Sequence, residues 1–258
     1  MSNKINFDET DQIPLWDDYN NQLRQKHFEG GYKHKHPVLF DYMYFDDKEK
    51  EEFFKQYIHP DIHWAETQKY TRWGQEWDFL LTEPAWEVYQ FPFFTKELSN
   101  MIIEEAEHFD EWVGPDEGPN NSISYGTTDT GLDGIPGTRN YKDKPLGKLY
   151  YDIQQKYLKP IMRYVWKYRV SHFEASYILK YELDGQDFLQ PHHDDNLCSS
   201  IVSLNDNFEG GGTLFERQKV TVYPKAGWCT LHPARLTHRH AGKRIIEGKR
   251  YIIVTFIS

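Results

Sequence analysis

The chain has 258 residues, of which 38% are hydrophobic and 16% aromatic, which is enough for one large domain with a substantial core. It carries 30 lysine and arginine residues against 40 aspartate and glutamate residues, so its formal net charge is −10. This balance argues against sequence-independent nucleic-acid binding and against a nucleic-acid demethylase, because both need basic surfaces, and it suits a cationic substrate.

Two helices are predicted in the first two thirds of the chain. Residues 1 to about 60 are polar and rich in aromatic residues, and they predict a surface arm or a short helix outside the core. A helix is predicted to begin at Thr95, a suitable N-cap, because apolar residues then recur at helical spacing in KELSNMIIEEAEHFDEW. The second helix is predicted from about Leu146 to Leu158, with Pro160 ending or kinking it.

After about Ser171 the sequence changes to short runs of β-branched and aromatic residues, separated by turn-forming segments such as DGQD, NDNFEGGG and PKAG. The predicted strands are ASYILKY, CSSIVSL, GTLFER, KVTVYP, GWCTLHP and RYIIVTFIS. Strands at this spacing favour an α+β protein with a double-stranded β-helix (jelly-roll) core and supporting N-terminal helices. The predicted organisation is an arm and lead-in segment at residues 1–84, followed by one domain at residues 85–258.

The segment QPHHDDNL lies between two predicted strands and concentrates ionisable side chains. Residues two apart in extended backbone point the same way, so His192 pairs with Asp194, whereas His193 faces the other way and is interpreted as structural. Two histidines and one carboxylate on one face form the triad that holds non-haem Fe(II). Neither cysteine has the spacing of a zinc site.

Three downstream histidines can supply the third ligand: His232, His238 and His240. His238 and His240 are two residues apart and can share a face, so both remain candidates on this reasoning. His232 precedes Pro233 and is interpreted as a packing residue or as one that supports a ligand from behind.

Arg250 opens the last predicted strand, in phase with Ile252, Val254 and Phe256. If those residues face the core, Arg250 faces it too, and a buried guanidinium needs an anion because it cannot shed its charge. A dicarboxylate that chelates iron at one end and pairs with Arg250 at the other would satisfy it, and 2-oxoglutarate has that shape.

The two cysteines, Cys198 and Cys229, are too few for a disulfide framework and are predicted to be buried free thiols. No apolar run approaches the length of a membrane span, and the first residues lack the apolar core of a secretory leader. The sequence therefore predicts a soluble chain.

Longer segments resemble a known family, the collagen lysyl hydroxylases, within the Fe(II)/2-oxoglutarate dioxygenases. The strong resemblance covers about residues 175 to 258, to the C-terminal catalytic domain of that family, and a looser one reaches back to about residue 85. It rests on LKYELDGQDFLQPHHDD, NFEGGGTLFE, PKAGWCTLHPARLTHRHAGK and GKRYIIVTFIS. The chain departs from the animal enzymes at Ile201, where they carry Asn, and in its missing leader, and it resembles the giant-virus members more.

Carried over by position, the resemblance implies iron ligands at His192, Asp194 and His240, which favours His240 over His238. It implies that Arg250 pairs with the far carboxylate of 2-oxoglutarate and that Tyr181 hydrogen-bonds this co-substrate. The implied dioxygenase domain is residues 85–258. Since the family is dimeric, Leu236 in the loop HPARLTH is a candidate contact between two copies.

The implied activity is hydroxylation of peptidyl-lysine at C5 in collagen-like X-Lys-Gly sequences, coupled to decarboxylation of 2-oxoglutarate to succinate and CO2. The implied cofactors are Fe(II), 2-oxoglutarate, O2 and ascorbate. The implied partners are a collagen-like peptide and a second copy of the chain, and the implied compartment is the lumen of the endoplasmic reticulum. Two alternatives remain: a prolyl hydroxylase or other protein hydroxylase of the same chemistry, and a non-catalytic jelly-roll binding module.

Overall fold

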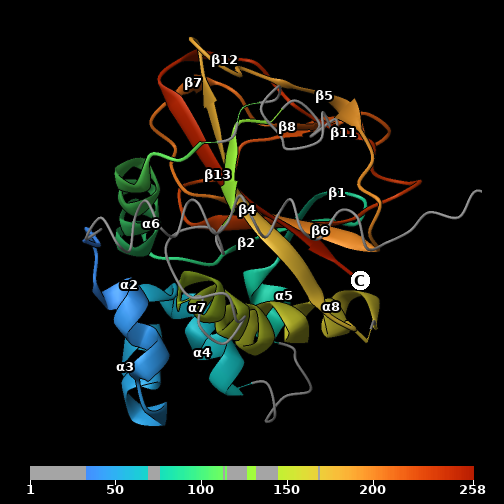
Figure 1. Cartoon of the computed structure of the whole chain (residues 1–258). Helices are drawn as coiled ribbons and strands as arrows, with labels where there is room; N and C mark the ends of the chain where they lie inside the picture. Colours follow the sequence, from blue (N-terminus) through green and yellow to red (C-terminus); the bar gives the residue numbers. More distant parts are fainter. Residues whose placement is uncertain (1–32, 69–75, 113, 115–126, 132–144, 168) are drawn as a thin grey trace, which may run out of the picture.

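The computed structural model describes residues 33–68, 76–112, 114, 127–131, 145–167 and 169–258 (Figure 1). Its helices are α2 (Val38–Asp41), α3 (Asp47–Tyr57), α4 (Pro60–Gln68), α5 (Glu76–Leu80), α6 (Lys96–Phe109), α7 (Pro145–Ile153) and α8 (Lys159–Trp166). A 3-10 turn (Tyr42–Tyr44) follows α2, and a π-helical turn (Gln154–Leu158) joins α7 to α8.

Seven strands form one antiparallel sheet, in the order β1-β2-β10-β6-β13-β4-β3. A second sheet has the order β5-β11-β8-β9, and β12 pairs with β7. The bounds are β1 (Thr82–Ala85), β2 (Val88–Pro92), β3 (Asp129–Gly131), β4 (Phe173–Glu182), β5 (Leu189–His192), β6 (Cys198–Ser203), β7 (Glu209–Gly210), β8 (Thr213–Phe215), β9 (Val220–Val222), β10 (Trp228–Pro233), β11 (His240–Gly242), β12 (Ile245–Glu247) and β13 (Lys249–Ile257).

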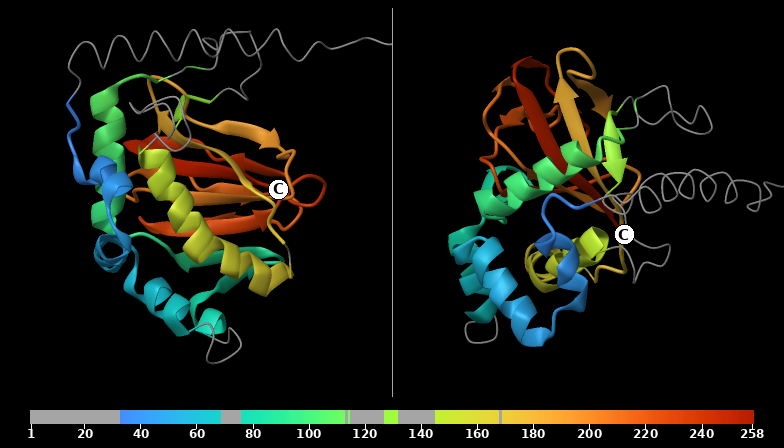
Figure 2. Two further views of the ribbon diagram at one scale, coloured as in Figure 1. Left: turned by 60° about the horizontal axis from the view of Figure 1, so that its bottom comes forward. Right: turned by 60° about the vertical axis from the view of Figure 1, so that its left-hand side comes forward.

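The large sheet lies between two layers. Most helices cover one of its faces, and the strands β5, β8 and β11 lie on the other side (Figures 1 and 2). The six strands predicted from the sequence are present as β4, β6, β8, β9, β10 and β13. Two facing antiparallel sheets with helical support agree with the predicted α+β class and jelly-roll core.

Strand β13 contributes to two separate cores because its side chains alternate between the faces of the sheet. Tyr251, Ile253 and Ile257 join the large buried cluster shared with the helices, which we call the helix-side core. Ile252 faces the other way and joins a smaller cluster with Leu179, Tyr181, Ile201 and Ile245, which we call the inter-sheet core. Arg250 has the parity of Ile252, as the sequence predicted.

Helix α6 begins as expected. The Thr95 hydroxyl oxygen accepts the backbone N–H of Leu98 at 3.3 Å, and Asp110 ends the helix in a left-handed conformation with φ 52°. Of the two alternatives predicted for Pro160, that it ends the second helix is wrong, because helical backbone continues to Trp166. Pro160 lies in the first turn of α8, directly after the π-helical turn.

The prediction that the first 60 residues stay outside the core is also wrong for the part that the structure describes. Leu39, Tyr42, Phe53 and Ile58 are buried in the helix-side core. Residues 1–32 of the predicted arm lie outside the described residues, and the boundary at residues 84 and 85 stays a prediction. Among the described residues, no helix has the length and apolar character that crossing a membrane requires.

Candidate metal and co-substrate site

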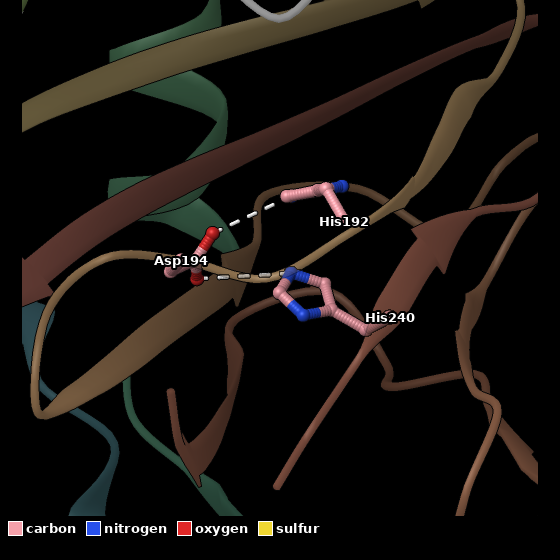
Figure 3. A group of neighbouring side chains, drawn as sticks. All are labelled: His192, Asp194 and His240. Atoms are coloured by element: carbon pink, nitrogen blue, oxygen red, sulfur yellow. Dashed lines mark ion pairs between the residues drawn. The ribbon is translucent and has the colours of Figure 1, made fainter. Parts of the chain in front are cut away.

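His192, Asp194 and His240 meet at one end of the space between the two sheets (Figure 3). His192 ends β5, His240 begins β11, and the two residues are direct cross-strand partners. Asp194 lies in the loop that leaves β5. One ligand atom of each residue lies within 4.8 Å of those of the other two, which is the spacing that a single metal ion needs.

Backbone carbonyls orient both imidazoles toward Asp194. Nδ1 of His192 lies 2.8 Å from the Gln190 carbonyl, and Nδ1 of His240 lies 3.0 Å from the His238 carbonyl. Since a carbonyl only accepts, each Nδ1 carries a proton and each Nε2 is left to face the carboxylate. The Nε2 atoms lie 3.4 Å and 3.7 Å from the Asp194 oxygens. This tautomer is the one in which Nε2 can bind a metal.

Asp194 is held as a carboxylate. It is buried, which by itself raises its pKa, but its interactions with the imidazoles of His192, His240 and His232 lower the pKa well below its usual range. The Ser199 hydroxyl donates a further hydrogen bond to Oδ2 at 2.5 Å. Burial lowers the pKa of His192, but its bonds to Asp194 and Gln190 outweigh that and raise it, so metal binding competes with a proton there.

The structure distinguishes between the candidate third ligands. Nε2 of His238 donates to the Trp86 carbonyl at 3.0 Å, and Nδ1 lies 2.9 Å from the Thr237 hydroxyl, so neither nitrogen is free for a metal. His232 is fully buried, and its ring centroid lies 4.8 Å from that of His240. It therefore supports His240 from behind, and His193 does not belong to the group.

Arg250 is only 1% exposed and spans the two sheets. It extends from β13, where Tyr181 of β4 is its cross-strand partner, and donates to the Gly212 carbonyl at 3.0 Å and to the Thr213 hydroxyl at 3.2 Å. Its guanidinium lies 5.3 Å from the Tyr181 ring centroid. None of its contacts within the described residues is a carboxylate, so this buried cation fits an anionic ligand.

Tyr181 connects the Arg250 region to the metal-binding region. A Cβ added at Gly242, two residues after His240 in β11, would lie 3.1 Å from the Tyr181 hydroxyl. Burial raises the pKa of Tyr181, so the phenol stays protonated and can donate a hydrogen bond. The Tyr181 side chain thus lies close both to β11, which carries His240, and to the Arg250 guanidinium.

Sequence reasoning missed Ser199 and the backbone acceptor at Gly212. A serine inside a predicted strand gives no local signal that it will meet a carboxylate. The EGGGT segment was interpreted as a tight turn, and Gly210, Gly211 and Gly212 do have φ values of 77°, 65° and 88°. The contact from Gly212 to Arg250 depends on the packing of the two sheets, which the segment does not encode locally.

Sequence comparison identifies relatives of this chain. No family profile matches the chain. Procollagen-lysine,2-oxoglutarate 5-dioxygenase 1 of Mus musculus is 31% identical over 186 residues, which is 69% of this chain and 25% of that protein. The Gallus gallus protein of the same name is 33% identical over 187 residues, with the same two shares. The chain spans about a quarter of the length of the curated relatives it matches.

Two solved structures share the fold. A prolyl hydroxylase of Trichoplax adhaerens, in complex with a peptide fragment of hypoxia inducible factor, has a TM-score of 0.53 at 12% identity, over 84% of this chain and 94% of that one. A 2OG-Fe(II) oxygenase family oxidoreductase of Burkholderia pseudomallei has a TM-score of 0.50 at 14% identity, over 76% and 90%. These structures confirm the fold class, and the sequence similarity identifies the chain as a relative of the procollagen-lysine,2-oxoglutarate 5-dioxygenases.

Proposed function

We propose that the chain hydroxylates peptidyl-lysine at C5 in collagen-like X-Lys-Gly sequences, with 2-oxoglutarate as co-substrate. One atom of O2 enters the lysine and the other enters succinate, with release of CO2. The observation that carries the proposal is the meeting of His192, Asp194 and His240 in a chain whose relatives are named for this reaction. The proposed reductant is ascorbate, and the proposed compartment is the lumen of the endoplasmic reticulum.

Each site residue has a role in this proposal. A ferrous ion held by His192, Asp194 and His240 would supply the activation of oxygen and the oxidation of the C5–H bond. Arg250 pairs with the far carboxylate of 2-oxoglutarate, and a fork-shaped guanidinium suits that carboxylate because it can donate two hydrogen bonds. Tyr181 donates a hydrogen bond from its hydroxyl to the co-substrate. The inter-sheet core keeps water away from the reacting atoms.

Replacement of Asp194 tests the proposal. Asp194→Ala is expected to abolish lysine-dependent succinate formation and to lower metal affinity, because two imidazoles alone hold Fe(II) weakly. Asp195→Ala is the control, since Asp195 is an exposed carboxylate one residue away. Mass spectrometry of a collagen-like peptide locates the added oxygen. Full activity in Asp194→Ala contradicts the proposal.

The same experiment separates the alternatives. Oxygen added to proline would identify a prolyl hydroxylase, and oxygen added to lysine supports the proposed reaction. If iron and 2-oxoglutarate bind but no CO2 is released with any peptide, the chain is a binding module.

We also propose that two copies of the chain associate through Leu236. This side chain is 87% exposed in the loop between β10 and β11, next to Arg235, whose φ is 44°. Leu236→Asp is expected to convert a dimer to a monomer in light scattering. A wild-type chain that is already monomeric at micromolar concentration would contradict this part.

A further inference from the structure

Trp86 presents an exposed aromatic ring at the tip of the β1–β2 hairpin and is held there firmly. It is 58% exposed, yet its ring stacks on His238 with centroids 5.7 Å apart and an interplanar angle of 24°. Its carbonyl accepts a hydrogen bond from Nε2 of His238 at 3.0 Å. A rigid, exposed indole is a favourable contact surface, because little conformational entropy is lost when a ligand covers it.

His238 connects the ring to the proposed metal site. The backbone carbonyl of His238, the residue that holds Trp86, also accepts a hydrogen bond from Nδ1 of His240 at 3.0 Å. Two hydrogen bonds therefore connect the hairpin tip to a proposed ligand. Extended peptide advances about 3.3 Å per residue. A peptide that extends from the site toward the hairpin tip would therefore reach Trp86 within a few residues of its lysine.

Two carboxylates belong to the same hairpin as the indole. The Glu83 side chain accepts the backbone N–H of Glu87 at 2.7 Å, and Glu87 has a left-handed backbone with φ 54°. Neither forms an ion pair with a lysine or arginine among the residues that the structure describes. Burial lowers the pKa of His238, and the exposed Arg217 adds a smaller effect in the same direction. The surface therefore holds two carboxylates against one guanidinium.

We propose that Trp86, with Glu83 and Glu87 beside it, binds a basic side chain of the peptide substrate at a position that flanks the hydroxylated lysine. A cation over the indole face is attracted by the ring quadrupole, and the carboxylates strengthen that attraction. A proline over the same ring would gain apolar contact but nothing from the carboxylates. This inference rests on the proposed function, because it takes a peptide as the occupant.

Peptide binding without turnover tests it. Two labelled collagen-like peptides, identical except for arginine or glutamine beside the lysine, are titrated by fluorescence anisotropy under anaerobic conditions with Fe(II) and 2-oxoglutarate. The wild-type chain is expected to prefer the arginine peptide. Trp86→Ala is expected to weaken binding of that peptide about tenfold and to remove the preference.

Three further variants sharpen the result. Trp86→Phe is expected to keep part of the preference, because an aromatic face remains. The double variant Glu83→Gln, Glu87→Gln is expected to reduce both the preference and its salt dependence. Trp64→Ala is the control, because Trp64 is 51% exposed on α4 and lies beside the base of the hairpin, near Thr82 and Pro92, rather than at its tip; it is expected to keep the wild-type preference.

Several results would overturn the inference. Equal affinity of the wild-type chain for both peptides would do so, as would an equal loss of preference in Trp64→Ala. A proline-flanked peptide that binds as tightly as the arginine peptide would show that the charge of the flanking side chain does not contribute to affinity. Conversion of a dimer to a monomer by Trp86→Ala would assign the surface to a second copy. Trp86-dependent binding without hydroxylation in air would contradict only the proposed function.

Discussion

Ser199 shows how one residue supports the candidate site without being a ligand. It lies in β6 opposite His232 of β10, and its hydroxyl is bonded to Oδ2 of Asp194 at 2.5 Å. This bond fixes the carboxylate orientation and favours its charged form. It depends on strand register and a loop conformation, and for that reason the sequence alone did not reveal it.

Ser199→Ala is expected to weaken metal affinity about tenfold or more, because Asp194 loses a donor that orients it. Metal titration with a competing chelator measures this. Ser200→Ala removes the same hydroxyl from the next residue, where no contact with Asp194 exists in the described structure, and it should bind metal like the wild type. Equal affinity in both variants would show that the Ser199 bond does not orient the ligand.

Arg250→Ala is expected to have opposite effects on ligand binding and on stability. The KM for 2-oxoglutarate should rise by orders of magnitude, because the anionic ligand loses its buried partner. The free energy of unfolding without ligand should fall little or even rise, since the variant no longer buries a cation that burial disfavours. Steady-state kinetics and urea unfolding measure the two quantities. An unchanged KM would place the anchor elsewhere.

Among the elements, the long strands and α6 were predictable because each has a local apolar period. Strands β5, β7, β11 and β12 have two to four residues and were missed, since their pairing partners lie far away in sequence. A short helix was one of the two alternatives predicted for the first 60 residues, and α3 is such a helix. The other N-terminal helices were missed because charged residues surround their aromatic ones. A signal was present: Asp46 and Glu49 form a capping box at the start of α3.

The choice between His238 and His240 could not be made from the residues alone. Both are histidines in one short segment, and only the resemblance to a family favoured His240. In the structure the deciding contact for His238 is the Trp86 carbonyl, 152 positions earlier in the chain. Local pattern cannot report such a contact. The phase of Arg250 was predictable because strand alternation is local.

The turn before β8 has its own prediction. Gly212 has φ 88°, and an added Cβ would lie 2.7 Å from the Tyr223 ring and 3.0 Å from the Val222 carbonyl. Gly212→Ala is expected to cost about 1–3 kcal/mol of stability and to raise the KM for 2-oxoglutarate, because the carbonyl that holds Arg250 shifts.

Gly185→Ala is the control for this turn. The atoms nearest to its added Cβ belong to the flexible Glu182 side chain. Its free energy of unfolding should stay within about 0.5 kcal/mol of wild type. A stable Gly212→Ala variant with normal kinetics would show that the turn tolerates a side chain.

For the whole molecule, buried His232 predicts a loss of stability in acid. Burial, with a smaller effect of His240, lowers the pKa of His232 to about 3. The unfolded chain binds this proton near pH 6.5 and the folded chain only near pH 3. The stabilisation that the neutral, buried His232 gives the fold is therefore complete above pH 6.5. It is lost as the pH falls toward 3, by at most roughly 1.4 kcal/mol per pH unit.

His232→Asn cannot take up this proton. Urea unfolding with EDTA between pH 6 and 4.5 is expected to show that the free energy of unfolding of this variant falls less steeply with acid than that of the wild type. The difference between the two slopes corresponds to at most one bound proton. The comparison of slopes removes the constant cost of the substitution. Identical slopes would mean that the imidazole titrates alike in the folded and unfolded states.

Strand β13 lies in the middle of the large sheet, between β6 and β4, although it comes after all the other strands in the chain. During translation, β4 and β6 cannot be joined until residues 249–257 have left the ribosome. A nonsense codon before Lys249 would therefore leave two open strand edges, which readily pair with other chains. The truncated protein should therefore aggregate, rather than fold into an enzyme with reduced activity.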